Sequence, residues 1–248
     1  MIVLGGGLIA RGLRPYESRA SDVTAFARGV ADSATHDDRA YARECALLYE
    51  AIGQCLRERR KLIYFSGGGA VYGPFDGPKD ERSPLFPATA YGRHQVTCEA
   101  IVRASGVRHL ILRLPNVVGA PQNPMQLVPN LVLQALRGEA TVYRDAARDL
   151  IDIADVARLA VHLAELVEDE TVVVATGRAT PVVDIFAAIQ RILGTSARVT
   201  VSPGGERQRF DARRLLRALP EASFDDSYPT RLLERYVPLL AGIDVRVA

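Results

Sequence analysis

The 248-residue chain has no tryptophan, only three cysteines, and lysine only as Lys61 and Lys79. Cys45, Cys55 and Cys98 are an odd set without C-x-x-C spacing, so we expect neither a disulfide framework nor a metal site. The scarcity of lysine leaves few candidates for a catalytic amine.

The sequence also lacks long apolar runs and any excess of one charge. No apolar stretch approaches the length of a membrane span, and the apolar start is too short for a signal peptide and lacks a basic region. The 31 basic residues balance 29 acidic ones, which gives no electrostatic argument for nucleic acid or an anionic membrane. We therefore expect a soluble cytoplasmic protein with neither kind of partner.

A glycine cluster near the amino terminus is the first functional signal. A short apolar run leads into Gly5-Gly6-Gly7 and then into residues that can open a helix, matching G-x-G-x-x-A. Gly5 permits a tight turn, Gly7 lets backbone approach a pyrophosphate, and Ala10 allows close helix–strand packing. The turn predicts a dinucleotide site, with a plain glycine-rich turn as the alternative. The residues assigned to the cofactor are Gly5, Gly7, Leu8, Ile9, Ala10, Arg11 and Arg14.

Apolar runs and helical periodicities alternate along the chain, which predicts a parallel sheet with helices on both faces. In the long helix expected at 37–60, the residues spaced for one buried face are Tyr41, Cys45, Leu48, Ile52 and Leu56. The tail from residue 207 is expected to be mostly helical. Expected strands are 2–5, 24–27, 61–66, 109–114 and 172–175, and the other expected helices are 8–13, 88–105, 126–138, 155–167 and 182–193.

One part of a dinucleotide-binding fold is missing from this pattern. Only residues 14–23 separate the first helix from the next strand, too few for a second strand, a crossover and a third strand. No acidic residue follows at the usual distance to accept the ribose hydroxyls. The sequence predicts a shortened adenosine half, or an adenosine held in an unusual way.

Four stretches in order resemble the extended short-chain dehydrogenase/reductases, in the group of nucleotide-sugar epimerases, dehydratases and 4-ketoreductases. The glycine turn is similar to the cofactor loop, and 65–73 is similar to S-S-x-x-V-Y-G. Residues 81–99 resemble the P-x-x-x-Y-G-x-x-K helix, while 112–119 and 148–156 resemble R-x-x-N-V-x-G and R-D-x-I-x-V-x-D-V. The resemblance implies a doubly wound Rossmann-like core at 1–175, with substrate contacts from about 116–150. It implies a small substrate lobe at 176–248.

The resemblance assigns Tyr91 as the proton donor for a ketone reduced by hydride. The family lowers the phenol pKa with a lysine one helical turn later and orients the carbonyl with a Ser or Thr hydroxyl. Here Gln95 and Gly68 stand at those positions, and Ser66 is the nearest hydroxyl. Gln95 can donate hydrogen bonds to a nicotinamide ribose but brings no charge. The catalytic assignment is therefore Tyr91, assisted by Ser66 and Gln95.

Further positions follow from the resemblance. Asn116, Asn123 and Gln126 fall where the family contacts a sugar nucleotide, and Arg148 resembles the arginine that grips the pyrophosphate. His94, three residues after Tyr91, is a helical neighbour and an alternative proton donor, although a solvated surface histidine is the preferred interpretation.

Two functions stay open at this point. The first is NAD(P)-dependent reduction of a nucleoside-diphosphate 4-keto-6-deoxyhexose, with NADP favoured because Arg11, Arg14 and Arg19 could accept a 2′-phosphate. The second is a redox-silent relative that binds a nucleotide sugar or a protein partner, or catalyses epimerisation or elimination through Tyr91 and His94. Family members often pair through helices that correspond to 37–59 and 88–104, which implies a homodimer.

Overall fold

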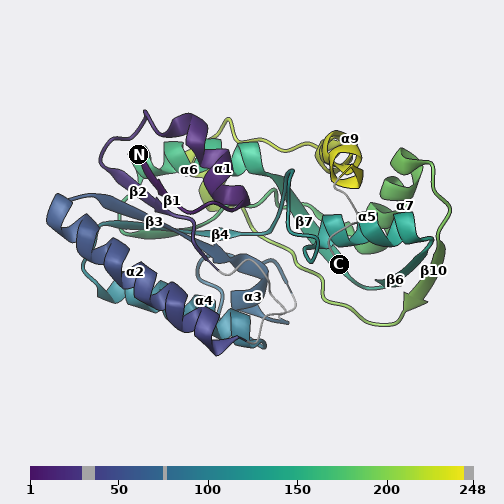
Figure 1. The fold of residues 1–248 in the computed structure, drawn as a ribbon, viewed down its shortest axis with the longest axis horizontal. Helices are drawn as coiled ribbons and strands as arrows, with labels where there is room; N and C mark the ends of the chain where they lie inside the picture. Colours follow the sequence, from purple (N-terminus) through teal and green to yellow (C-terminus); the bar gives the residue numbers. More distant parts are fainter. Residues whose placement is uncertain (30–36, 75–76, 243–248) are drawn as a thin grey trace.

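The computed structural model describes residues 1–29, 37–74 and 77–242. A five-stranded parallel sheet forms its centre, in the order β1-β2-β3-β4-β8. Its strands are β1 (Ile2–Leu4), β2 (Val23–Phe26), β3 (Lys61–Gly67), β4 (His109–Leu114) and β8 (Glu170–Val173). The expected strands are thus all present, and the α/β fold is confirmed (Figure 1).

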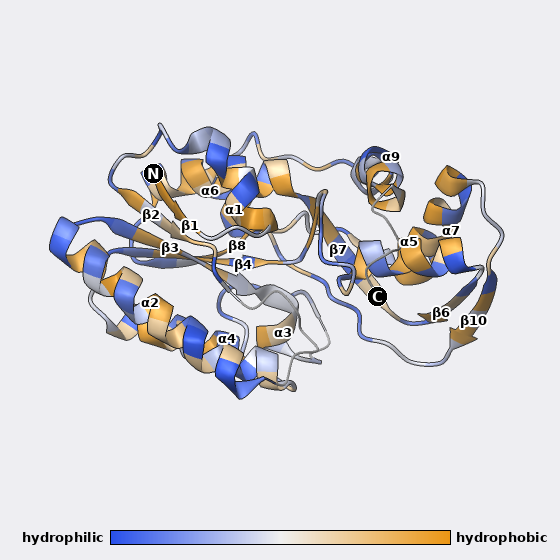
Figure 2. Cartoon of the chain, viewed as in Figure 1, coloured by the Kyte–Doolittle hydropathy of each residue, from blue (hydrophilic) through white to orange (hydrophobic). Residues whose placement is uncertain are grey.

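Helices cover both faces of this sheet, because the strands are buried and apolar on both sides. On one face lie α1 (Leu8–Leu13) and α6 (Ile153–Leu166); on the other lie α2 (Asp38–Glu58) and α4 (Ala90–Ala104) (Figure 1). Figure 2 shows apolar colour along the central strands and mixed polar and apolar residues around α2. Among the described residues, no helix is long and apolar enough to cross a bilayer.

The buried face of α2 differs from the expected one. Leu56 is 48% exposed, whereas Glu44 and Cys55 are buried. Tyr41, Leu48 and Ile52 do face inward as expected. Leu56, near the end of α2, therefore lies at the surface, while Glu44, near its start, faces His94 on α4.

The shortened adenosine half is confirmed by the sheet order. A doubly wound sheet usually holds its first strand at the centre, but here β1 pairs with β2 alone among the described residues. Between α1 and β2 the chain forms only the short 3-10 helix η1 (Arg14–Tyr16) and turns. The sheet therefore begins at the strand that carries the glycine turn.

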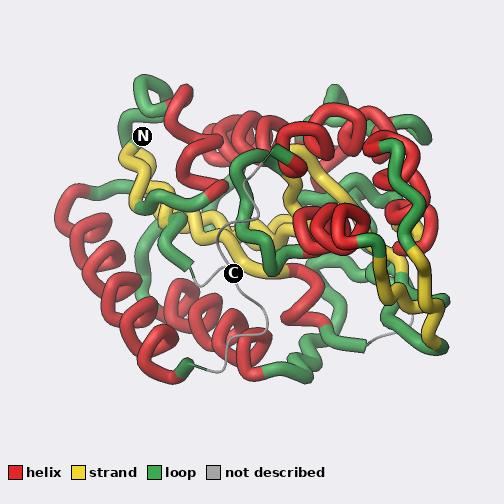
Figure 3. Tube along the Cα trace, turned by 45° about the vertical axis from the view of Figure 1, so that its right-hand side comes forward, coloured by secondary structure: helices red, strands yellow, loops and turns green. Residues whose placement is uncertain are grey.

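A second group of elements forms a lobe beside the core, drawn from chain on both sides of β8 (Figures 1 and 3). A three-stranded sheet has the order β5-β7-β9, and β6 pairs with β10. These strands are β5 (Asn116–Val118), β6 (Glu139–Tyr143), β7 (Ala147–Asp152), β9 (Ala179–Pro181) and β10 (Arg198–Ser202), accompanied by helices α5 (Leu127–Arg137), α7 (Val182–Leu193) and α9 (Tyr228–Ala241).

The sequence pattern did not predict these lobe strands, because most are short and several alternate in burial or lie exposed. The tail is less helical than expected. Its helices α8 (Arg213–Ala218) and α9 are separated by turns and irregular chain at 219–227, and residues 207 and 210 form isolated bridges to Ala147 and Lys79, respectively. The remaining helix, α3 (Gly68–Tyr72), follows β3 directly.

Candidate active site

A cavity of about 530 Å³ lies where the carboxyl ends of the core strands meet the lobe. This is the usual place for a ligand in a parallel α/β sheet. Its wall is formed by segments from both core and lobe. They are the glycine turn, the end of β3, α4, the chain after β4, the start of α5, and β7. Among its lining residues are Gly7, Gly67, Tyr91, Asn116, Gln126 and Arg148.

The glycine turn has the geometry that its sequence requires. Gly5 has φ +137°, and a Cβ there would lie 2.2 Å from the carbonyl oxygen of Ala27, so only glycine fits. Cβ atoms at Gly6 and Gly7 would meet nothing within 4 Å. The backbone before α1 is therefore open to a ligand, and a smaller hollow lined by Gly5, Gly6, Gly7, Ala27, Arg28, Gly29 and Leu47 adjoins the main cavity.

The other residues assigned to the cofactor are distributed differently. Leu8 and Ile9 line the main cavity. Ala10 is fully buried, in keeping with its expected packing role. The Arg11 guanidinium donates to the carbonyl oxygens of Gly6 and Pro121. Arg14 is exposed on η1 and lines neither cavity.

Tyr91 stands in the first turn of α4, which begins where the Thr89 hydroxyl accepts a hydrogen bond from the Gly92 N–H. The helix approaches the loop after β3 closely, because a Cβ at Gly92 would lie 2.4 Å from the carbonyl oxygen of Ala70. The Tyr91 hydroxyl consequently lies against the backbone of Gly67, where an added Cβ would be 3.2 Å away. The phenol thus reaches the cavity wall.

A buried ion pair holds α4 in this position. The Arg113 guanidinium on β4 donates to both carboxylate oxygens of Glu99 on α4, at 3.0 and 2.7 Å. Burial opposes both charges, yet the mutual hydrogen bonds leave the pKa of Glu99 lowered. Arg113 also donates to the Tyr72 hydroxyl at 2.9 Å. The pair therefore ties the strand, α3 and the tyrosine-bearing helix together.

Neighbouring side chains and backbone surround Gln95 and Gly68, the two positions that depart from the family pattern. Gln95 lines the cavity, but its side-chain oxygen accepts a hydrogen bond from the Tyr64 hydroxyl at 3.2 Å. Gly68 has no room for a serine, because a Cβ there would lie 3.0 Å from the Leu114 carbonyl oxygen and 3.1 Å from the Phe210 ring. The aromatic ring from the tail takes the space of the missing hydroxyl.

Ser66, the nearest hydroxyl on β3, lines the cavity. It pairs in register with Arg113, whose side chain points to α4, so the Ser66 side chain lies on the same face of the sheet. Its hydroxyl oxygen is shielded from solvent, and the Ser66 hydroxyl helps to lower the pKa of Glu99.

His94 is not the solvated surface residue that the sequence favoured. Its side chain is 6% exposed, its Nε2 lies 3.0 Å from a Glu44 carboxylate oxygen, and its ring stacks on Tyr41 at 4.4 Å. It faces α2 and does not line either cavity. His94 is buried because α2 packs against this side of α4 and places Glu44 beside it.

On the lobe side, three of the four residues assigned to the sugar nucleotide converge. Asn116, Gln126 and Arg148 line the cavity. Asn123 does not, because it sits in the turn before α5 and its side-chain oxygen accepts from the Met125 N–H.

Arg148 is a partly buried cation. Its guanidinium donates to the backbone carbonyl oxygens of Ala147 and Glu206, at 3.0 and 2.6 Å. Burial lowers its pKa, and in the described part of the chain it has no ion pair with a carboxylate within 4.0 Å. An arginine held by carbonyls beside a cavity can receive an anion such as a diphosphate.

Sequence reasoning missed Gln208. This side chain from the tail lines the cavity, accepts a hydrogen bond from Asn116 Nδ2 at 3.2 Å, and occupies the space beside Gly69. A lone glutamine in an arginine-rich tail has no motif around it. Its position becomes clear only in the structure, where the tail segment that carries it runs beside β7.

The residues fit a nicotinamide dinucleotide in part. The open glycine backbone fits the pyrophosphate of the cofactor. The cavity wall at Leu8, Ile9 and Tyr91 fits its nicotinamide end. The sheet offers no strand beyond β1, within the described ranges, to support an adenosine. The described residues thus fit the pyrophosphate and nicotinamide of such a cofactor well and its adenosine poorly.

The comparisons with known proteins agree with this fold. The putative UDP-glucose 4-epimerase of Methanocaldococcus jannaschii is 30% identical over 145 residues, which are 54% of this chain and 47% of the relative. The matched region thus spans about half the length of that relative. The UDP-glucose 4-epimerase of Azospirillum brasilense is 36% identical over 85 residues, covering 32% of this chain and 24% of the relative.

Solved structures show the same architecture at low identity. The UDP-glucose 4-epimerase of Thermus thermophilus, in complex with NAD, has a TM-score of 0.75 at 20% identity and covers 96% of this chain and 84% of its own. RMD from Pseudomonas aeruginosa, complexed with NADPH, has a TM-score of 0.79 at 18% identity, covering 97% and 98%.

A family model matches residues 20–175, more than half of the chain and most of the core that carries Tyr91, Asn116 and Arg148. With the strand order and the motifs now in place, the chain belongs to the NAD dependent epimerase/dehydratase family.

Proposed function

We propose that the cavity binds a nucleoside-diphosphate sugar, with Arg148 at the diphosphate and Tyr91 at the hexose. The observation that carries this proposal is the convergence of Tyr91, Asn116, Gln126 and Arg148 on one cavity. Arg148 adds a cation without a carboxylate partner in the described chain, which a diphosphate would neutralise. The amides of Asn116 and Gln126 supply donors and acceptors for the sugar hydroxyls.

The proposed reaction is reduction of a 4-keto-6-deoxyhexose carried on that nucleotide, with NADP as the favoured cofactor and NAD as the alternative. A bound nicotinamide cofactor supplies hydride chemistry. Gly5 and Gly7 would hold its pyrophosphate, Leu8 and Ile9 would contact its reactive half, and Arg11 and Arg14 are the candidates for a 2′-phosphate. Tyr91 would give its hydroxyl proton to the oxygen of the reduced carbonyl.

The side chains around Tyr91 favour reduction over epimerisation. An epimerase must start from a phenolate, which takes a proton from the sugar hydroxyl. A reductase starts from a phenol, which becomes a phenolate only on giving its proton to the new alkoxide and then regains a proton from solvent. Gln95 carries no charge to stabilise a phenolate, and neither Lys61 nor Lys79 lines the cavity. Tyr91 is therefore better suited to donate a proton than to accept one.

A second candidate follows from the sheet. The described chain has no strand beyond β1, where the adenosine half would rest. A redox-silent protein that binds the nucleotide sugar alone would keep the lobe contacts and need no adenosine site.

Calorimetric titrations separate the two candidates. The protein is titrated with UDP-, dTDP- and GDP-linked sugars, then with NADPH, NADH and reduced nicotinamide mononucleotide. Binding of a nucleotide sugar and of NADPH, with oxidation of NADPH by a keto-sugar nucleotide, supports the reductase. Sugar-nucleotide binding without any nicotinamide binding selects the redox-silent protein. Failure to bind any nucleotide sugar overturns both.

A further inference from the structure

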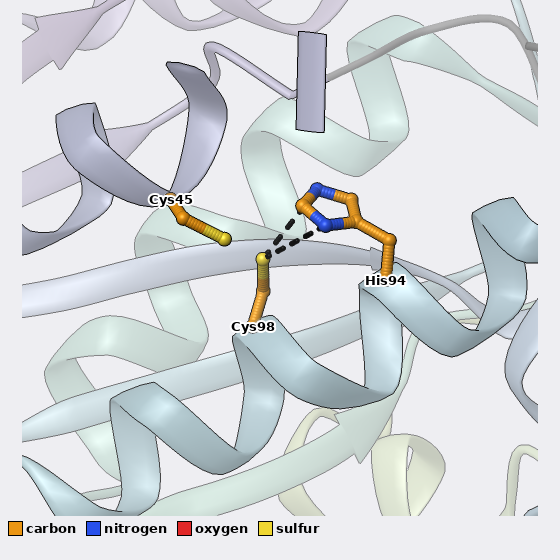
Figure 4. A group of neighbouring side chains, drawn as sticks. All are labelled: Cys45, His94 and Cys98. Carbon is orange, nitrogen blue, oxygen red and sulfur yellow. Dashed lines mark hydrogen bonds between the residues drawn. The ribbon is translucent and has the colours of Figure 1, made fainter. Parts of the chain in front are cut away.

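Three side chains able to bind a metal ion meet between α2 and α4, outside the cavity. Figure 4 shows Cys45 from α2 approaching His94 and Cys98 from α4. The ligand atoms of these three residues all lie within 4.8 Å of one another. Glu44, next to Cys45 on α2, adds a carboxylate oxygen 3.0 Å from His94 Nε2.

The packing of two helices creates this group. His94 and Cys98 are four residues apart and so share one face of α4. The packing of α2 on α4 places Cys45, on the expected buried face of α2, opposite them, and buries Glu44 beside His94. The Glu44 side chain is 2% exposed, that of His94 6%, and Cys98 is fully buried. Cys45 is partly exposed, which leaves an entry route from solvent.

The spacing agrees with a tetrahedral centre. Zinc binds thiolate sulfur at about 2.3 Å and imidazole nitrogen at about 2.0–2.1 Å, so tetrahedral angles put sulfur and nitrogen about 3.5 Å apart. Cys98 Sγ lies 3.6 Å from His94 Nε2. Two sulfurs and one imidazole nitrogen form a donor set that suits Zn²⁺ far better than Mg²⁺ or Ca²⁺.

We propose that Cys45, His94 and Cys98 form a zinc site that ties α2 to α4, with Glu44 as the carboxylate that orients the His94 imidazole. Binding replaces the two thiol protons, and any proton on the ligating imidazole nitrogen, with the metal ion, and the protons go to solvent. The Tyr64 hydroxyl, which donates to Gln95 in the cavity wall at 3.2 Å, also lies 3.4 Å from a Glu44 carboxylate oxygen. Tyr64 itself lines the cavity, so one side chain separates Glu44 from it, but the proposal does not depend on the reaction there.

The test uses untagged full-length protein, stripped of metal and titrated with Zn²⁺ in competition with a zinc-binding dye. We expect one Zn²⁺ per chain with a submicromolar Kd. Cys98→Ser should weaken binding by at least about 100-fold, whereas Cys55→Ser, a buried cysteine elsewhere on α2, should leave it within about threefold. Equal loss in both variants, or a Kd above 100 μM for the native protein, overturns the proposal.

A second measurement does not depend on the folding of a variant. Co²⁺ added to the native apoprotein should give the intense visible bands of a tetrahedral ion and a thiolate charge-transfer band. Zn²⁺ should also protect Cys45 from alkylation. A spectrum without thiolate ligation, or a Cys45–Cys98 disulfide found by mass spectrometry in the freshly purified protein, contradicts a zinc site.

Discussion

Individual side chains in the cavity divide between those that are kept from the family pattern and those that are replaced. Tyr91, Asn116 and Arg148 stand where the pattern expects them and line the cavity. Where the pattern expects a lysine after Tyr91, this chain has the neutral Gln95, whose side-chain oxygen accepts a hydrogen bond from the Tyr64 hydroxyl. These side chains consequently suit the proposed substrate contacts and proton donation better than they suit a stable phenolate at Tyr91.

Replacing Tyr91 by Phe should lower turnover of the keto-sugar nucleotide by about 10²–10⁴-fold, because the proton donor is lost. Affinity for the nucleotide sugar should change less than about fivefold, since the ring and its packing stay. Tyr49→Phe, at a tyrosine 59% exposed on α2, serves as the control. Turnover that survives Tyr91→Phe would remove Tyr91 from the mechanism.

Replacing Arg148 by Met should weaken binding of UDP and of UDP-sugars by about 10–100-fold, because a charge-assisted contact to the diphosphate is lost. Binding of uridine, which has no diphosphate, should stay unchanged. Arg137→Met, at an exposed arginine at the end of α5, is the matched control. Calorimetry gives both affinities, and equal effects of the two variants would argue against a diphosphate contact at Arg148.

Among the elements, close backbone approach decides where the site residues lie. Gly92 lets α4 approach Ala70, and the Arg113–Glu99 pair ties that helix to β4. Gly5 does the same for the turn between β1 and α1, which packs against Ala27 beyond β2. The positions of Tyr91 and of the glycine turn are thus set by residues that are not among the proposed catalytic residues.

Gly5→Ala should destabilise the protein by more than about 1 kcal/mol, because the added methyl meets the Ala27 carbonyl and φ is positive. Gly6→Ala, with nothing within 4 Å of its Cβ, should change stability by less than about 0.5 kcal/mol. Urea denaturation measures both. A Gly6→Ala protein as unstable as Gly5→Ala would show that the close approach is not what requires glycine at position 5.

Core and lobe are joined where β7 passes close to the end of β8, and a buried carboxylate lies at this junction. Asp149 accepts hydrogen bonds from the Thr176 hydroxyl at 2.8 Å, the Thr176 N–H at 3.1 Å and the Arg178 N–H at 3.2 Å. Burial nevertheless raises the pKa of Asp149 to about 7. The junction therefore titrates close to neutrality.

A raised pKa means that the folded protein holds this proton more tightly than the unfolded chain does. The resulting stabilisation is complete below about pH 4 and is lost as the pH rises to about 7. We expect the free energy of unfolding to fall by roughly 2–4 kcal/mol more in the native protein than in Asp149→Asn across that range. Parallel urea titrations from pH 4 to pH 8 test this, and identical pH dependence in both proteins would contradict it.

Local patterns were enough to predict the parallel sheet, its main helices and the shortened adenosine half. Strands such as β3 and β4 are buried on both faces, so each appears as a continuous apolar run. The glycine turn and the cavity-lining Tyr91 could be found because each lies in a short motif of residues close together in the chain. The short strands of the lobe leave no such pattern, since they depend on neighbours distant in the chain.

Only the packed chain decides which side chains meet. Gln208 reaches Asn116 across 92 positions, and Phe210 fills the space beside Gly68. His94 and Cys98 could be assigned to one face of α4 and Cys45 to one face of α2 from spacing alone, but only the packing of the two helices brings them together and buries Glu44 beside His94. Helical periodicity limits which residues share a face, whereas the angle at which that face meets its neighbour is set by the packing of the whole core.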